Sequence, residues 1–264
     1  MIYLTKEQFR DITQHAKDSY PKEACGILAG INGKVEKVYK MTNISDNPES
    51  CYFMKPEEQL KVFKEMRKIQ IEMIGIYHSH SNTPAYPSQR DCELAFYPEV
   101  DYVIISLKDF DCPEIRSFKI IEGKIKEEKI IIRKNILFID LDNSFNSQIA
   151  EAIVNNFYWQ KFYSYSAGLK PSGTINPFAV EVMKEIGIDI TNQKSKGLAQ
   201  IKNIEFDYII NLGCQDVNPN FIQNFSNNAQ QLNWNISQLR IETIEFSRKV
   251  RDEIENKIKE FFYG

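Results

Sequence analysis

Two histidines stand two positions apart at the end of an apolar run, followed by a serine and an aspartate, in the segment GIYHSHSNTPAYPSQRD. The run IEMIGIY predicts a buried strand, and residues i and i+2 of a strand face the same side, so the imidazoles of His78 and His80 converge. Ser88 and Asp91 follow a proline-containing loop and precede an apolar-periodic segment, which places Asp91 in the first turn of a helix. Two histidines and one carboxylate leave a coordination position for water, as in catalytic zinc sites. The segment therefore predicts a catalytic zinc centre held by His78, His80 and Asp91.

Each part of this segment also has a simpler interpretation. Ser-x-x-Asp before an apolar run is a helix capping box, so Ser88 and Asp91 are expected near a helix start whatever else they do. A single buried histidine is more often a hydrogen-bonded core residue than a metal ligand. Capping does not account for the histidines, however, and two of the three histidines in the chain lie here. A metal site is the favoured interpretation.

Size and charge favour two soluble domains. The 264 residues are enough for two domains that each bury a core. The net charge of −3, without a basic block, favours neither nucleic acid nor a membrane surface as a partner. The N-terminus has no apolar leader, no stretch reaches transmembrane length, and five cysteines without dense spacing fit a reducing compartment. We expect a cytoplasmic protein.

Strands and helices cluster in the first half without strict alternation. A capping box at Thr5 starts a helix, and the run CGILAG follows as a strand. A second helix begins near Pro56 and leads to the strand that ends at the histidines. Beyond the helix of Asp91, DYVIISL is a buried strand, and EIRSFKII with KEEKIII forms a hairpin. The pattern predicts an α+β domain over residues 1–134.

The sequence changes character near Lys134. ILFID is a short apolar strand, the polar loop DNSFNS follows it, and a helix begins at about Gln148. Strands and helices then alternate through SYSAG, NPFAVEVMKEIG and FDYIINLG, and a final helix covers about residues 246–262 with an apolar packing stripe. Alternation of this kind predicts an α/β domain with a parallel sheet over residues 135–264.

The spacing His-x-His, seven residues, Ser, two residues, Asp, with an upstream Glu beside a strand, resembles the JAMM (MPN+) family of zinc metalloproteases and isopeptidases. The matching acid is Glu23 in YPKEACGILAG. The resemblance implies an α+β JAMM/MPN-type domain in which His78, His80 and Asp91 hold Zn²⁺. It implies that Glu23 is the general base and that Ser88 stabilises the oxyanion. Without the resemblance, Glu23 would be taken for an ordinary surface acid after a helix.

Family members cut peptide or isopeptide bonds after the extended tail of ubiquitin-like proteins, and compact prokaryotic members are often linked to sulfur-carrier proteins. The resemblance therefore implies a ubiquitin-like or sulfur-carrier protein as the substrate. An extended tail can add as a strand beside the site, where backbone hydrogen bonds give affinity and a narrow groove selects small residues.

The second half resembles the low-molecular-weight tyrosine phosphatase and arsenate reductase family through ILFIDLDNSFNSQIAEA, SYSAGLKPSGTINPFAVEVMKEIGIDI and FDYIINLGC. The phosphate loop of that family runs Cys, five residues, Arg, Ser, whereas this chain has Asp140, Asn146 and Ser147 at those places. Both the nucleophile and the anion clamp are missing. Asp140 and Asp142 also place negative charge in a loop that should hold an oxyanion.

The later catalytic positions of that family are altered as well. Gln238 and Leu239 stand where the family has an Asp-Pro general acid, and Asn218 stands where a redox partner for Cys214 is expected. We therefore predict a catalytically inactive phosphatase-like domain. Asp-Leu-Asp after a strand also resembles the opening of haloacid-dehalogenase phosphatases, but this short motif is weak.

The sequence leaves three hypotheses for the function of the chain. The leading hypothesis is a zinc-dependent peptidase or isopeptidase joined to an inactive phosphatase-like domain that serves as a docking surface, a regulatory ligand site or a dimerisation element in a possible homodimer. The alternative is a non-catalytic two-domain binding or scaffold protein, which has no evident need for Glu23 and Ser88 together with the ligands. A phosphatase or arsenate reductase acting through the second domain lacks a nucleophile.

Overall fold

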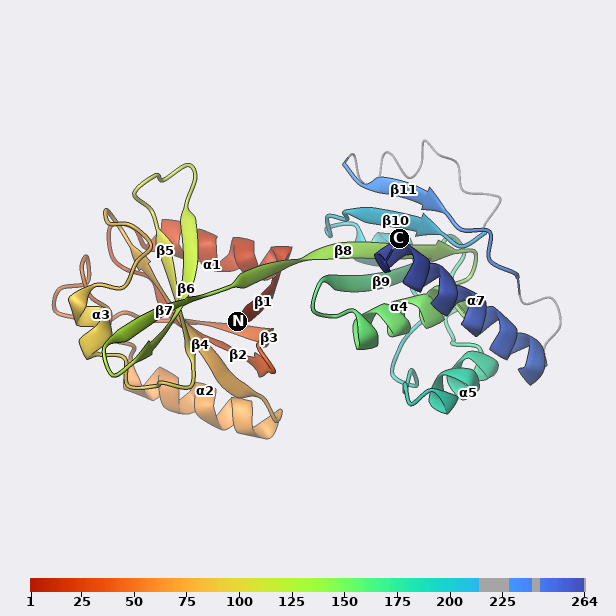
Figure 1. Ribbon diagram of the computed structural model, residues 1–264, viewed down its shortest axis with the longest axis horizontal. Helices are drawn as coiled ribbons and strands as arrows, with labels where there is room; N and C mark the ends of the chain where they lie inside the picture. The colour runs from red at the N-terminus through yellow and green to blue at the C-terminus, as the bar shows by residue number, and fades with distance from the viewer. Residues whose placement is uncertain (214–227, 239–242, 264) are drawn as a thin grey trace. The chain divides into compact units, whose positions relative to one another are not determined.

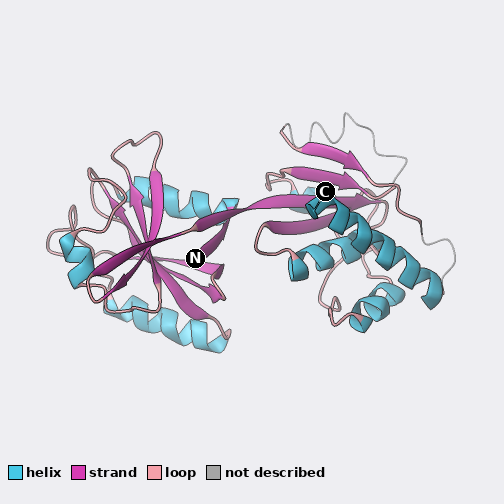
Figure 2. Ribbon diagram, viewed as in Figure 1, coloured by secondary structure: helices cyan, strands magenta, loops and turns pink. Residues whose placement is uncertain are grey.

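The computed structural model of the chain describes residues 1–213, 228–238 and 243–263 (Figure 1). The chain divides into two compact units, Met1–Ile132 and Arg133–Gly264. Each unit combines a β-sheet with helices (Figure 2). None of the helices in the described ranges has both the length and the apolar composition of a bilayer-spanning segment.

The first unit is built on a mixed sheet in the order β1-β3-β2-β4-β5-β6-β7. The pairs β1–β3 and β4–β5 are parallel and the other pairs are antiparallel, which confirms the α+β class. Its elements are β1 (Ile2–Thr5), α1 (Lys6–Ser19), β2 (Cys25–Ile31), β3 (Lys34–Met41), α2 (Pro56–Lys68), β4 (Glu72–His80), α3 (Gln89–Glu93), β5 (Asp101–Ser106), β6 (Glu114–Ile121) and β7 (Lys124–Glu128).

Helices α1 and α2 lie on opposite faces of this sheet (Figure 1). Because side chains alternate along a strand, β4 sends Ile76 into the core that contains α2 and Tyr77 into the core that contains α1. His78 and His80 are two and four positions beyond Ile76, so both imidazoles point to the α2 face. The predicted convergence of the two rings follows from this alternation.

The second unit has a parallel sheet in the order β11-β10-β8-β9, which confirms the α/β class. Helices α4, α5 and α7 contribute buried apolar residues to a large core on the sheet, and the 3₁₀ helix η1 contributes to a smaller one. The elements are β8 (Ile130–Asp140), α4 (Asn146–Phe157), β9 (Phe162–Gly168), α5 (Pro177–Glu185), η1 (Leu198–Ile201), β10 (Tyr208–Asn211), β11 (Gln230–Asn233) and α7 (Ile244–Tyr263).

The prediction for residues 124–140 is wrong in one respect. KEEKIII is not one hairpin arm, because β7 ends at Glu128 and β8 runs without a break from Ile130 to Asp140. Arg133, the first residue of the second unit, is only 1% exposed, and its guanidinium lies 5.1 Å from the ring centre of Tyr163. The predicted boundary, between residues 134 and 135, therefore falls inside a strand.

Candidate functional site

The end of β4 and the start of β2 form the floor of the candidate site. The strands are antiparallel and Cys25 is paired with His78, so Glu23 lies beside His80 in the extension of the same register. The amide of Ser79 donates to the carbonyl of Ala24 at 2.9 Å, and the amide of Ala24 donates to the hydroxyl of Ser79 at 2.8 Å. The chain segment that carries Glu23 is thereby fixed against the strand that carries the histidines.

A capping box places Asp91 at the same point. The amide of Asp91 donates to Oγ of Ser88 at 3.1 Å, and the amide of Ser88 donates to Oδ2 of Asp91 at 2.7 Å. The capping interpretation of this pair is therefore correct. It coexists with the metal interpretation, because the Asp91 carboxylate also reaches both imidazoles.

The three candidate ligand groups, two imidazoles and the carboxylate of Asp91, form a compact triangle. Nε2 of His78 and Nε2 of His80 are 3.1 Å apart. Oδ1 of Asp91 lies 3.3 Å from Nε2 of His78, and Oδ2 of Asp91 lies 3.3 Å from Nε2 of His80. A tetrahedral zinc ion with bonds of about 2.0–2.1 Å separates its ligands by about 3.3 Å. Within the described part of the chain, this is the one group of three or more His, Cys, Asp or Glu residues with such a geometry. The donor set and its spacing fit a metal ion.

Two of the three side chains already favour the protonation state that metal binding requires. Burial opposes ionisation of Asp91, but hydrogen bonds to His78, His80 and Ser88 hold its pKa well below its ordinary value. Burial lowers the pKa of His78, which favours the neutral ring. The pKa of His80 is raised, because its bonds to Asp91 and Pro84 outweigh its burial. A metal ion has to displace the proton of His80.

The carbonyl of Pro84 orients His80. It lies 2.9 Å from Nδ1 of His80, which assigns the proton to Nδ1 in the neutral ring and turns the Nε2 lone pair toward the triangle. Outer-sphere bonds of this kind fix both the tautomer and the ring plane of a metal-binding histidine. The role of Pro84 is not visible in the sequence, since a backbone carbonyl carries no side-chain signal.

Glu23 is a buried acid with only 5% of its surface exposed, so the surface-acid alternative is wrong. Its amide donates to the carbonyl of Pro48 at 2.7 Å, and Nδ2 of Asn43 donates to its carbonyl oxygen at 2.9 Å. Burial raises the pKa of Glu23 to about 7, with Asp91 adding to the shift and His80 opposing it. A carboxyl group with this pKa can accept and return a proton near neutral pH.

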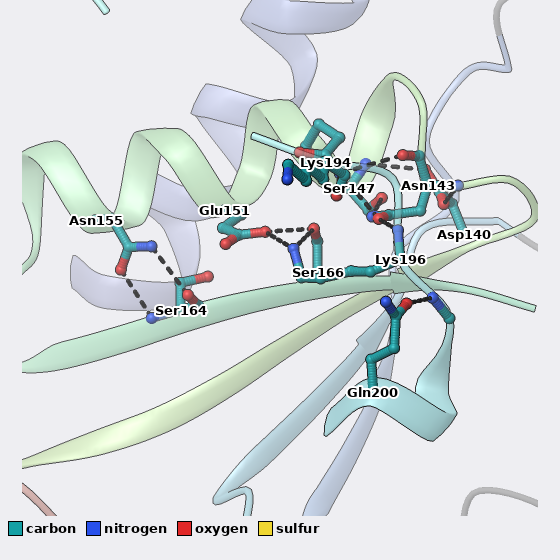
Figure 3. A network of polar contacts seen from close by, with 12 residues as sticks. Asp140, Asn143, Ser147, Glu151, Asn155, Ser164, Ser166, Lys194, Lys196 and Gln200 are labelled. Carbon is teal, nitrogen blue, oxygen red and sulfur yellow. Dashed lines mark hydrogen bonds and ion pairs between the residues drawn. The ribbon is translucent and has the colours of Figure 1, made fainter. Parts of the chain in front are cut away.

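In the second unit, the loop between β8 and α4 surrounds a carboxylate of its own (Figure 3). The amides of Asn143 and Ser147 donate to the two oxygens of Asp140 at 2.7 and 2.9 Å. Asn143 adopts a left-handed conformation, with φ of 52°, which turns its amide inward. Burial raises the pKa of Asp140 to about 6, so the group is still mostly ionised at neutral pH. The Asp140 carboxylate therefore accepts from two backbone amides that would otherwise be available to bind an oxyanion.

Side chains around the loop hold it in this shape. Nδ2 of Asn143 donates to Oγ of Ser147 at 2.8 Å, and the amide of Lys196 donates to Oδ1 of Asn143 at 2.7 Å. Nζ of Lys196 lies 2.9 Å from the carboxylate of Glu151, which also accepts from Ser166 (Figure 3). These contacts connect the loop to α4, β9 and the segment of Lys196.

The remaining positions of the predicted inactive site are only partly described. Gln238 donates to the carbonyls of Leu212 and Ile236 at 2.8 and 3.0 Å and offers no acidic proton. Cys214, Asn218 and Leu239 lie outside the described residues.

We expect no turnover of p-nitrophenyl phosphate or arsenate by the chain, because the Asp140 carboxylate binds two amides of the loop and carries a negative charge. Steady-state assays at neutral pH measure this. Rates of about 1 per second or more, typical of enzymes, would contradict it if they disappeared in Ser147→Ala. Rates that persist in this variant reveal a contaminating phosphatase.

Comparisons with known proteins agree with this two-part organisation. The sequence model of the family described as prokaryotic homologs of the JAB domain matches residues 5–121. CysO-cysteine peptidase of Mycobacterium tuberculosis is 41% identical over 132 residues, which are 49% of this chain and 90% of that protein. Desampylase of Pyrococcus furiosus is 36% identical over 110 residues, which are 42% of this chain and 76% of that protein.

A different family covers the second half. The model described as low molecular weight phosphotyrosine protein phosphatase matches residues 135–263. Arsenate reductase 2 of Staphylococcus saprophyticus is 33% identical over 130 residues, which are 49% of this chain and 97% of that protein. The chain therefore belongs to two families, with a JAMM-type domain of the prokaryotic JAB group at its N-terminus and a low-molecular-weight phosphatase domain after it.

Proposed function

We propose that the first unit is a zinc-dependent peptidase or isopeptidase. The observation that carries this proposal is the triangle of His78, His80 and Asp91 at tetrahedral ligand separations, with the buried acid Glu23 beside it. Relatives named as a peptidase and a desampylase support a hydrolase. A pure scaffold has no need for a buried acid whose pKa is raised to about 7 next to three ligands.

Each residue of the site has its own role in the proposed hydrolysis of an amide bond. A zinc ion held by His78, His80 and Asp91 supplies a Lewis acid that makes water nucleophilic at neutral pH. Glu23 takes a proton from the attacking water and returns it to the departing amine. Ser88 is exposed at the start of α3, and its hydroxyl, which accepts from the amide of Asp91, can also donate to the carbonyl oxygen under attack.

We propose that the substrate carries the extended C-terminal tail of a ubiquitin-like or sulfur-carrier protein. The name of the Mycobacterium tuberculosis relative, CysO-cysteine peptidase, supports this class. In this chain, Asn43 and Met54 form an isolated antiparallel bridge, and Phe53 beside it is 56% exposed. Phe96, three residues after α3, is 73% exposed. Exposed rings at these two positions suit contacts with a docked tail.

The test is cleavage of a sulfur-carrier or ubiquitin-like protein extended by one residue beyond its Gly-Gly terminus. The zinc-loaded chain is expected to remove the extension, and a chelator is expected to abolish the reaction until zinc is restored. Mass spectrometry of the products measures the cut site. Trimming of short peptides with the fusion left intact would show that tail recognition is wrong. No cleavage of either substrate by the zinc-loaded chain contradicts the peptidase assignment and favours the scaffold.

A further inference from the structure

The ring of Tyr52 lies flat against the imidazole of His78. The ring centres are 4.7 Å apart and the ring planes differ by 25°, which is a stacked arrangement. Tyr52 is half-buried and packs against the core on the α2 face, next to the ligand triangle. It lies outside the His-x-His, Ser and Asp positions that form the recognisable motif.

The imidazole rings of His78 and His80 differ in their hydrogen bonds at Nδ1. His80 has the carbonyl of Pro84 at 2.9 Å from its Nδ1. Nδ1 of His78 is buried and has no hydrogen-bond partner among the described residues. A neutral ring that turns its Nε2 lone pair to a metal carries its proton on Nδ1, so no hydrogen bond at Nδ1 fixes the tilt of this ring as it does for His80. The face of Tyr52 is the flat surface that can do so.

Asn43 in turn fixes the position of Tyr52. Its Nδ2 donates to the carbonyl of Cys51 at 3.1 Å, and its Oδ1 accepts from the amide of Phe53 at 3.1 Å, so one side chain binds both neighbours of Tyr52. The same Nδ2 also donates to the carbonyl of Glu23 at 2.9 Å. One amide side chain therefore connects the segment of the general base to the segment that carries the stacked ring.

We propose that Tyr52, anchored through Asn43, is a positioning residue that sets the ring plane of His78 for metal binding. This rests on the proposed function of the site. Stacking on Tyr52 orients the ring of His78, whereas a hydrogen bond orients the ring of His80. The important property of Tyr52 is its flat ring and not its hydroxyl group, so phenylalanine should replace it and an aliphatic side chain should not.

The experiment compares Tyr52→Phe, Tyr52→Leu and the control Phe63→Leu, which removes a half-buried ring from the same core without touching His78. We measure the zinc dissociation constant by chelator competition and the visible absorption of the Co²⁺-loaded protein, which reports ligand geometry. Loss of an outer-sphere partner typically weakens metal binding about 10–100-fold. Tyr52→Leu is expected to show a loss of this size and an altered Co²⁺ spectrum, whereas Tyr52→Phe and Phe63→Leu should match the unmodified chain.

Unchanged zinc affinity and Co²⁺ spectrum in Tyr52→Leu, or equal losses in Phe63→Leu, overturn the positioning role while leaving the metal site intact. Failure of the unmodified chain to bind zinc overturns the proposed function itself. If thermal unfolding of the zinc-free protein shows that Tyr52→Leu is not folded, Tyr52→Met, which fills the space with a flexible chain and no ring, takes its place with the same expected losses.

Discussion

Replacing Glu23 with glutamine is expected to lower kcat by about 10²–10⁴-fold, the usual contribution of a general acid–base group. The amide has nearly the same shape but cannot accept the proton of water. Zinc content should stay at that of the unmodified chain, because the triangle of candidate ligands consists of His78, His80 and Asp91. The fold should also tolerate the change, since burial already raises the pKa of Glu23 to about 7 and the neutral amide avoids a buried charge.

Metal analysis and steady-state kinetics on the same preparation test this expectation. Glu49→Gln is the matched control, because Glu49 is an exposed acid in the segment whose Pro48 accepts from the amide of Glu23. This control should retain full turnover and full zinc content. Loss of zinc in Glu23→Gln would identify Glu23 as a ligand, and undiminished turnover would remove it from the mechanism.

Replacing Asp91 with asparagine is expected to weaken zinc binding by more than about 100-fold, because a direct ligand contributes more than the outer-sphere partners whose loss costs about 10–100-fold. Asparagine can still accept from the amide of Ser88, so the start of α3 should survive. The negative charge that faces both imidazoles is lost. Turnover should fall with zinc occupancy and should recover in part at high zinc concentration.

Ser88→Ala separates the two roles of the capping box. It removes the acceptor for the amide of Asp91 and the donor for the oxyanion but leaves the carboxylate in place. Zinc affinity should change little, whereas kcat should fall about 10²–10³-fold, as after loss of one oxyanion donor. Chelator titration and kinetics on both variants measure this contrast. Equal zinc affinity in Asp91→Asn and in the unmodified chain would exclude Asp91 from the ligand set.

The local parts of the site could be predicted from the sequence because they depend on short-range geometry. Strand alternation brings His78 and His80 together, and the capping box sets Asp91 at the start of α3. The burial of Glu23 could not be worked out in the same way. It depends on the pairing of β2 with β4 and on the contact of its amide with Pro48, both of which are long-range.

The other features could not be predicted, because they depend on contacts that leave no pattern in the sequence. Tyr52 contacts His78 through a segment held by a single asparagine side chain, and no residue spacing signals such a contact. The change of pattern near Lys134 predicts a domain boundary there, but β8 runs through this point and Arg133 is buried in it. In the second half, the negative charge of Asp140 was foreseen, but its bonds to the amides of Asn143 and Ser147 depend on the fold of the loop.

The carboxylate of Asp140 has a consequence for how the second unit responds to its surroundings. A protein that binds a free anion only in its native state gains stability as that anion becomes more concentrated. Here the stabilising anion is part of the polypeptide and is always present at the loop. The shape of this loop is therefore expected to be independent of the phosphate concentration, because the anion that its amides bind is supplied by the chain itself.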